Sequence, residues 1–236
     1  MEDNHLCCGS SCTGSKNRSN WRMIFDEFVH HFPYAIFSVS LCFVILGFLR
    51  YTTCDVVSRS CIEKSSHILF HSFHFLHIVF SATGSMVCYF RFSRNILRGL
   101  LVGIFATVVF CTLSDAVIPY LAGCILGVDM SFHLCFLSHL NNVLPFLGIG
   151  LLNGLLLGLF HNSRGSFYSV FSHFVHILIS SLASTFYMVS HGFFHWDKVI
   201  GLLFLFLVIA VVIPCTLSDV VVPMAAAKAG KKNERN

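Results

Sequence analysis

Long apolar stretches separated by short polar segments dominate this chain. Six of the stretches are long enough to cross a hydrocarbon core, which takes about 20 helical residues at ~1.5 Å each. They lie near residues 28–50, 66–90, 97–123, 139–160, 167–190 and 198–226. The pattern predicts an all-α integral membrane protein with six transmembrane helices, whose main partner is the lipid bilayer.

Composition supports a membrane location. The 236 residues are 56% hydrophobic and 11% charged, against roughly 45–50% and 25% in a soluble domain. Residues 1–20 are polar and lack the apolar core of a cleavable signal peptide, so we expect the first span to remain as an anchor.

Basic residues predict the orientation, because cytoplasmic loops carry an excess of Lys and Arg. With both termini inside, the inner segments hold eleven such residues and the outer segments hold four. We therefore expect cytoplasmic N- and C-termini. These flanking cations account for the net charge of +4, so no nucleic-acid partner is needed.

Two motifs occur twice. "HFLHIVFS" at 74–81 returns as "HFVHILIS" at 173–180, and "CTLSDAVIP" at 111–119 agrees with "CTLSDVVVP" at 215–223 in seven of nine positions. The chain thus divides into two copies of a unit of three spans. Because each unit crosses the membrane an odd number of times, the second copy must have the opposite orientation in the membrane. This predicts two inverted-topology three-helix repeats like those of many secondary transporters.

The predicted boundaries follow from this repeat. They are a polar, cysteine-containing cytoplasmic tail at 1–27, a first repeat at 28–124, a second repeat at 125–227 and a basic cytoplasmic tail at 228–236.

The histidines and aspartates are the candidate chemistry. On a helix, positions i, i+3 and i+7 share a face, so His74, His77 and Ser81 form one polar stripe. His173, His176 and Ser180 form the other. Imidazole binds transition metals and carries protons, and a carboxylate at membrane depth needs a partner. We predict metal ligands at His74, His77, Asp115, His173, His176 and Asp219.

Each Asp is followed four positions later by a proline, Pro119 or Pro223, which removes a helical hydrogen bond. We expect a broken or kinked helix there, with a freed carbonyl in an oxygen-rich pocket. The supporting polar residues would be Ser81, Thr112, Ser114, Ser180, Thr216 and Ser218.

Depth estimates place each histidine pair and its Asp at a similar level of the bilayer. Asp115 should therefore approach His74 or His77, and Asp219 should approach His173 or His176. Structural interpretations stay open, since a membrane histidine often bonds across a helix interface and an Asp near a span end can cap a helix.

Other motifs have simpler interpretations. The series Gly150, Gly154 and Gly158 predicts close helix packing. His191 and His195, beside Trp196, form either an outer metal trap or, as we prefer, interfacial surface.

Cysteines divide by compartment. Cys54 and Cys61 fall in an outer loop where a disulfide is permitted. In the inner tail, Cys7, Cys8 and Cys12 with His5 could bind a soft metal or be palmitoylated, or could simply be spare thiols.

At these motifs the chain resembles a group of bacterial six-span membrane proteins that carry H-x-x-H-x-x-x-S and T-L-S-D or S-D-x-x-x-P in each half. The likeness covers residues 66–226 and implies fold, topology and a bacterial inner-membrane location, but no activity. The cysteine-bearing tail, His67 and His71 depart from it.

The pattern favours a transporter or permease for a divalent transition metal (Fe, Mn or Zn), and the same histidines suit proton coupling. Alternatives are an intramembrane haem redox protein, a metal-dependent membrane hydrolase and a small-solute carrier. The two similar residue sets argue against an enzyme, and no phosphate loop or nucleophile elbow occurs. A homo-oligomer is compatible with this pattern.

Overall fold

The computed structural model describes residues 20–53, 58–160 and 166–233. Over these residues the chain forms helices and no strand. Six helices, two of them running through a π-helical turn, are long and apolar enough to cross a membrane. The predicted all-α, six-span architecture is therefore confirmed.

The six spans are bounded as follows. They are α1 (Asn20–Thr53), α2 (Arg59–Phe92), α3 to α4 (Ile96–Thr112 and Ile118–Ile125, joined by a π-helical turn at Leu113–Val117), α6 (Leu140–Phe160), α7 (Ser166–Ser190), and α8 to α9 (Ile200–Thr216 and Val222–Asn233, joined by a π-helical turn at Leu217–Val221). Short helices at Cys135–Ser138 (α5) and Trp196–Val199 precede the fourth and sixth spans.

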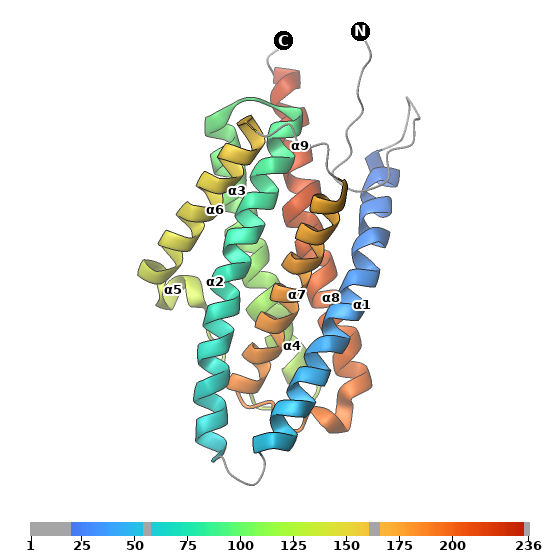
Figure 1. Ribbon diagram of the computed structural model, residues 1–236, viewed down its shortest axis with the longest axis vertical. Coiled ribbons are helices and arrows are strands. Elements are labelled where there is room, and N and C mark those ends of the chain that lie inside the picture. Colours follow the sequence, from blue (N-terminus) through green and yellow to red (C-terminus); the bar gives the residue numbers. More distant parts are fainter. Residues whose placement is uncertain (1–19, 54–57, 161–165, 234–236) are drawn as a thin grey trace.

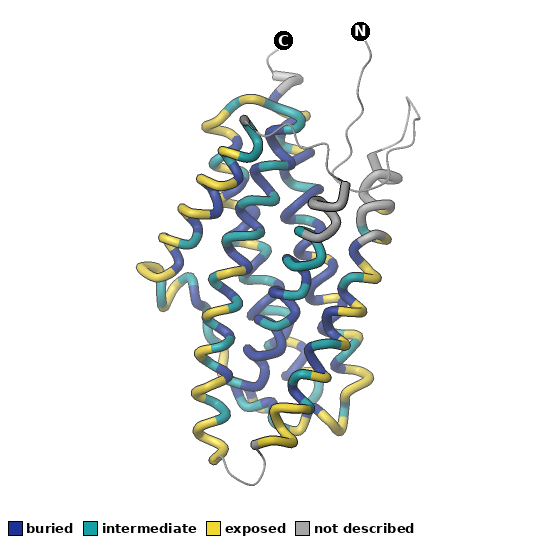
Figure 2. The backbone as a smooth tube through the Cα atoms, in the orientation of Figure 1, coloured by how far each residue is buried: buried dark blue, intermediate teal, exposed yellow. Residues whose placement is uncertain are grey.

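The spans alternate in direction, so the start of α1 and the end of α9 lie at one end of the bundle (Figure 1). Helices α2 and α7 run side by side through its middle, with α6 and α3 against α2, and α1 and α8 against α7. Burial follows this plan, since the buried residues gather along the central helices and exposed ones line the outside (Figure 2).

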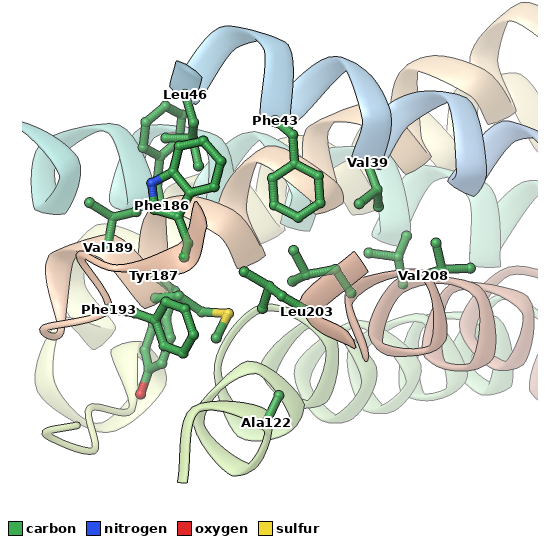
Figure 3. Packing of buried hydrophobic residues seen from close by; sticks show 14 of the residues in the cluster. Val39, Phe43, Leu46, Ala122, Phe186, Tyr187, Val189, Phe193, Leu203 and Val208 are labelled. Atoms are coloured by element: carbon green, nitrogen blue, oxygen red, sulfur yellow. The ribbon is translucent and has the colours of Figure 1, made fainter. Parts of the chain in front are cut away.

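Two apolar clusters stabilise the bundle. The larger joins α1, α7 and α8, where Val39 and Phe43 of α1 face Leu203 and Val208 of α8 (Figure 3). Trp196 is buried in this cluster and stacks on Phe43 with ring centroids 5.8 Å apart. The smaller cluster joins α2, α3 and α6.

The glycine series on α6 confirms the prediction of close helix packing. A Cβ added at Gly150 would lie 2.7 Å from the carbonyl oxygen of Val79, and one at Gly154 would lie 2.6 Å from Cβ of Met86. Only glycine allows α6 to approach α2 this closely. The contact holds α2, which carries the first histidine motif, in place.

The outward faces are apolar. Large side chains such as Phe37, Val44, Leu101, Leu152 and Leu205 are exposed on different spans. Exposed apolar area on this scale is unusual for a soluble monomer and is what lipid-facing helices require.

Candidate metal centre

Both CTLSD motifs fold in the same way, as a single π-helical turn inside a continuous helix. The N–H of Ile118 bonds the carbonyl of Leu113, and the N–H of Val222 bonds that of Leu217. Because Pro119 and Pro223 have no N–H to offer the Asp carbonyl, the helix widens by one residue instead of breaking. This is the form that the expected kink takes, and it turns each Asp into the bundle.

Asp115 is wholly buried and its carboxylate has four donors. His74 Nδ1 and His77 Nδ1 donate to Oδ2 at 2.8 and 2.7 Å. Ser114 Oγ and Ser180 Oγ donate to Oδ1 at 2.7 and 3.1 Å. The predicted approach of Asp115 to the first histidine pair is confirmed, and the Asp caps no helix end in water.

Asp219 is also buried but less completely bonded. His176 Nδ1 lies 2.7 Å from its Oδ2, while His173 Nδ1 lies at 4.0 Å. Its Oδ1 has no hydrogen-bond partner among the described residues. Gly84 lies against the carboxylate, since a Cβ there would be 3.3 Å from Asp219 Cγ. The predicted approach of Asp219 to the second histidine pair is confirmed too, although Asp219 has fewer hydrogen bonds than Asp115.

Serines bond each motif to the opposite half of the chain. Ser85 Oγ donates to the carbonyl of Ser218 at 2.8 Å, and Ser184 Oγ donates to that of Ser114 at 2.9 Å. Ser81 Oγ bonds Ser218 Oγ at 2.8 Å, and the equivalent pair Ser180 and Ser114 lies at 3.4 Å. Residues at equivalent sequence positions therefore make equivalent contacts across the two halves.

Between these crossed pairs, three ligand-type side chains converge. The rings of His77 and His176 lie 4.7 Å apart, centroid to centroid. Cys215 Sγ is 3.8 Å from His77 Nε2, and one ligand atom from each of the three residues falls within 4.8 Å of the others. All three are buried, and His176 Nε2 has no hydrogen-bond partner in the described part of the chain. Cys111, the counterpart of Cys215, is buried beside His77 and Ser81.

The two aspartates fix the orientation of the His77 and His176 rings. A carboxylate that accepts from Nδ1–H holds a neutral imidazole in one tautomer and leaves the lone pair on Nε2. In His77 this Nε2 edge faces Cys215 Sγ at 3.8 Å, and a ring nitrogen of His176 lies within 4.8 Å of that sulfur. The group composed of His77, His176 and Cys215, here named the central site, has the donor set of a transition-metal site.

The predicted site residues thus divide by position. His77 and His176 offer ring nitrogens to the central site, and Asp115 and Asp219 bond the far side of those rings. His74 and His173 flank the aspartates. Four predicted serines link the halves, whereas Thr112 and Thr216 each bond a carbonyl of their own helix at 2.7 Å and lie outside the central site.

A second histidine group lies nearer the end of the bundle opposite the chain ends. This rim cluster comprises His67, His71, His133, His139 and His191. His67 Nε2 and His71 Nε2 are 3.2 Å apart, and Cys135 Sγ lies 3.4 Å from His71 Nδ1. His67, His71 and His133 also bring one ligand atom each within 4.8 Å of one another.

The interpretation of His191 as interfacial surface is wrong. Its side chain is buried, its Nδ1–H donates to the carbonyl of Tyr187 at 2.7 Å, and its ring stacks on that of Tyr187. Burial lowers the pKa of His191 and of His133, and burial raises the pKa of Cys135 to about 12. These rings and this thiol are therefore neutral near pH 7. His195, in contrast, is exposed.

Three histidines in or near these groups were not identified as candidates from the sequence. His133 and His139 reach the rim cluster from the segment between the third and fourth spans. His31 of α1 is buried, with its ring 5.2 Å from that of His173. The count of 14 histidines in so apolar a chain was the one sequence signal that further histidines would join these groups. Cys7, Cys8, Cys12 and Cys54 lie outside the described residues.

Comparison with protein-family models, with curated proteins and with solved structures gives no significant match for this chain. The site must therefore be interpreted from its own geometry, and the resemblance to bacterial six-span proteins stays a prediction.

Proposed function

We propose that the protein is a multi-pass transporter or permease for a divalent transition-metal cation. The observation that carries this proposal is the central site, where His77, His176 and Cys215 converge deep inside a six-span bundle. Ionisable residues within membrane spans are rare and costly, and they mark ion pathways and proton relays in many membrane proteins.

The crossed contacts support an inverted-topology repeat. Each proposed repeat supplies one histidine pair, one π-helical turn and one buried Asp, and each bonds the other through its serines. The central site lies where the halves meet, with His77 from the first and His176 and Cys215 from the second. Substrate sites of inverted-repeat transporters occupy this position, near the bilayer midplane.

The donor set favours zinc or ferrous iron over manganese among the ions considered. Imidazole suits zinc and iron, and thiolate adds to the preference for zinc, whereas manganese prefers oxygen ligands. A ligating Cys215 must lose its proton when the metal arrives. Asp115 with His74 and His77, and Asp219 with His176, form two hydrogen-bonded groups beside the site. Such groups act as proton relays in membrane proteins, which supports proton coupling.

A haem between His77 and His176 does not fit this geometry. Imidazoles on the two faces of a porphyrin need their ring centroids on the order of 6 Å apart, given metal–nitrogen bonds of about 2 Å. The two rings lie at 4.7 Å. The arrangement therefore favours a small ion over a flat macrocycle.

The same proposal includes a bacterial inner-membrane location with cytoplasmic termini. The start of α1 and the end of α9 lie at one end of the bundle (Figure 1), as six crossings require. The excess of Lys and Arg in the segments at that end supports the cytoplasmic assignment.

Metal flux into proteoliposomes tests the function. Wild-type protein should carry Zn²⁺ or Fe²⁺ to an entrapped metal-sensitive dye, and His77→Ala with His176→Ala should reduce the rate to that of empty liposomes. His195→Ala, which changes an exposed histidine outside both groups, is the matched control and should transport normally. Equal flux by the double variant and the control would reject the proposal.

A further inference from the structure

We infer that the rim cluster contains a second, separate divalent transition-metal site, formed by His67, His71 and His133. Its residues are distinct from those of the central site. Along α2, His67 precedes His77 by ten residues, which is about 15 Å of helix. The inference goes beyond the proposed transport function, because such a site can bind metal whether or not the central site does.

The spacing of His67 and His71 carries the first part of the argument. Histidines at i and i+4 project from one face of a helix, the arrangement that the helical pair of many zinc sites uses. Their Nε2 atoms lie 3.2 Å apart. Two nitrogens bound to one tetrahedral zinc at 2.0–2.1 Å are separated by roughly 3.3 Å. The pair already has the separation that a shared ion requires.

His133 supplies the third donor from a different part of the chain. Its Nε2 is buried and has no hydrogen-bond partner among the described residues, and one of its ring nitrogens lies within 4.8 Å of a ring nitrogen of each of the other two histidines. An imidazole nitrogen left without a partner beside two others is better explained by a ligand than by packing. Three histidines with an open fourth position form a common zinc arrangement.

The backbone of His133 is held in place for this role. Tyr187 Oη accepts from the N–H of His133 at 3.2 Å and donates to its carbonyl at 3.4 Å. Tyr187 itself is fully buried on α7. Cys135 Sγ lies 3.4 Å from His71 Nδ1, so it can accept a hydrogen bond from Nδ1–H when Nε2 binds the ion. The segment after α4 is therefore attached to the bundle at the point where it delivers the ligand.

The three residues remain reachable from outside the bundle. His67, His71 and His133 are each half-buried, whereas His77 and His176 are buried. The rim site is thus the one that an ion arriving from that end of the bundle meets first. Neutral imidazole donors suit Zn²⁺, Co²⁺, Ni²⁺ and Cu²⁺, so the ligand class is a borderline divalent cation.

Cobalt titration of the purified, chelator-stripped full chain in detergent tests the site. Only the central site contains a cysteine among its proposed ligands, so only there should bound Co²⁺ give a thiolate-to-metal charge-transfer band. Wild type should bind two equivalents and show the band. His67→Ala/His71→Ala/His133→Ala should bind one fewer and keep the band, and Cys215→Ser should lose the band while the rim equivalent remains.

Every outcome separates the two sites. An unchanged stoichiometry in the triple variant would overturn the rim site, whatever the central site does. One equivalent in wild type that lacks the band and disappears in the triple variant would support the rim site and reject the central one. If the triple variant is recovered poorly, His67→Ala alone should weaken rim binding at least about 10-fold. His195→Ala should bind like wild type, and a His67→Ala titration that matches it would also overturn the inference.

Discussion

His77 and His176 come from opposite halves of the chain, yet their rings lie 4.7 Å apart in the middle of the bundle. Each ring is bonded through Nδ1 to a buried aspartate of its own half, and each offers one ring nitrogen within 4.8 Å of Cys215 Sγ. This relationship links the duplicated sequence motifs to a single candidate centre.

Replacing Asp115 with Asn should weaken metal binding at the central site. The amide can no longer accept from four donors, so His77 loses its fixed tautomer. Loss of such a supporting carboxylate typically lowers metal affinity by roughly 10–100-fold. Competition titration with a chelator measures the change. Asp197→Asn, at a solvent-exposed aspartate paired with Arg50, is the control and should bind as wild type does.

Asp219→Asn should destabilise the fold less than Asp115→Asn. The Asp219 carboxylate has one strong histidine bond and an Oδ1 without a partner among the described residues, so an amide leaves fewer donors unmatched. Thermal unfolding of the two metal-free variants in the same detergent gives the comparison. An Asp219→Asn midpoint as low as that of Asp115→Asn would show that the asymmetry has no energetic meaning.

Gly154→Ala should lower stability without changing the site. The new Cβ would lie 2.6 Å from that of Met86, which forces α6 away from α2. Overpacking of this kind costs about 1–3 kcal/mol. Gly148→Ala on the same helix meets nothing within 4 Å and is the matched control. Thermal unfolding should separate the two variants, while the metal bound per recovered molecule stays equal. Equal unfolding midpoints for Gly154→Ala and Gly148→Ala would contradict the role of Gly154 in helix packing.

Both termini should face the cytoplasm. Epitope tags at residues 1 and 236 should be hidden from antibody in intact cells and become accessible after permeabilisation, because six spans return the chain to its starting side. A tag inserted between α1 and α2 should be accessible without permeabilisation. The opposite pattern would reverse the orientation, and one exposed terminus would contradict the six-span count.

Much of this architecture can be predicted from the chain. Span length and apolar content suffice for six helices, and the duplicated spacing of His74, His77 and Asp115 is enough to predict their proximity, because a buried carboxylate needs a partner. The glycine series on α6 likewise identifies a helix contact, since only small residues permit it.

Which atom faces which neighbour could not be predicted. Asp115 and Asp219 were expected as direct ligands, whereas each turns its carboxylate to a histidine Nδ1. That outcome depends on helix rotation and on the π-helical turn, neither of which a spacing pattern specifies. His133 joins the rim cluster through its bonds to Tyr187, a contact between segments 54 residues apart.

X-ray absorption at the zinc edge tests the central claim most directly. The sample is zinc-loaded protein carrying His67→Ala, His71→Ala and His133→Ala, so that only the central site is filled. The account predicts a mixed shell with imidazole nitrogen at about 2.0–2.1 Å and at least one sulfur at about 2.3 Å, the sulfur disappearing when Cys215 and Cys111 are changed to Ser. A shell of nitrogen and oxygen alone, or no stoichiometric zinc, would contradict the assignment of the ion to His77, His176 and Cys215.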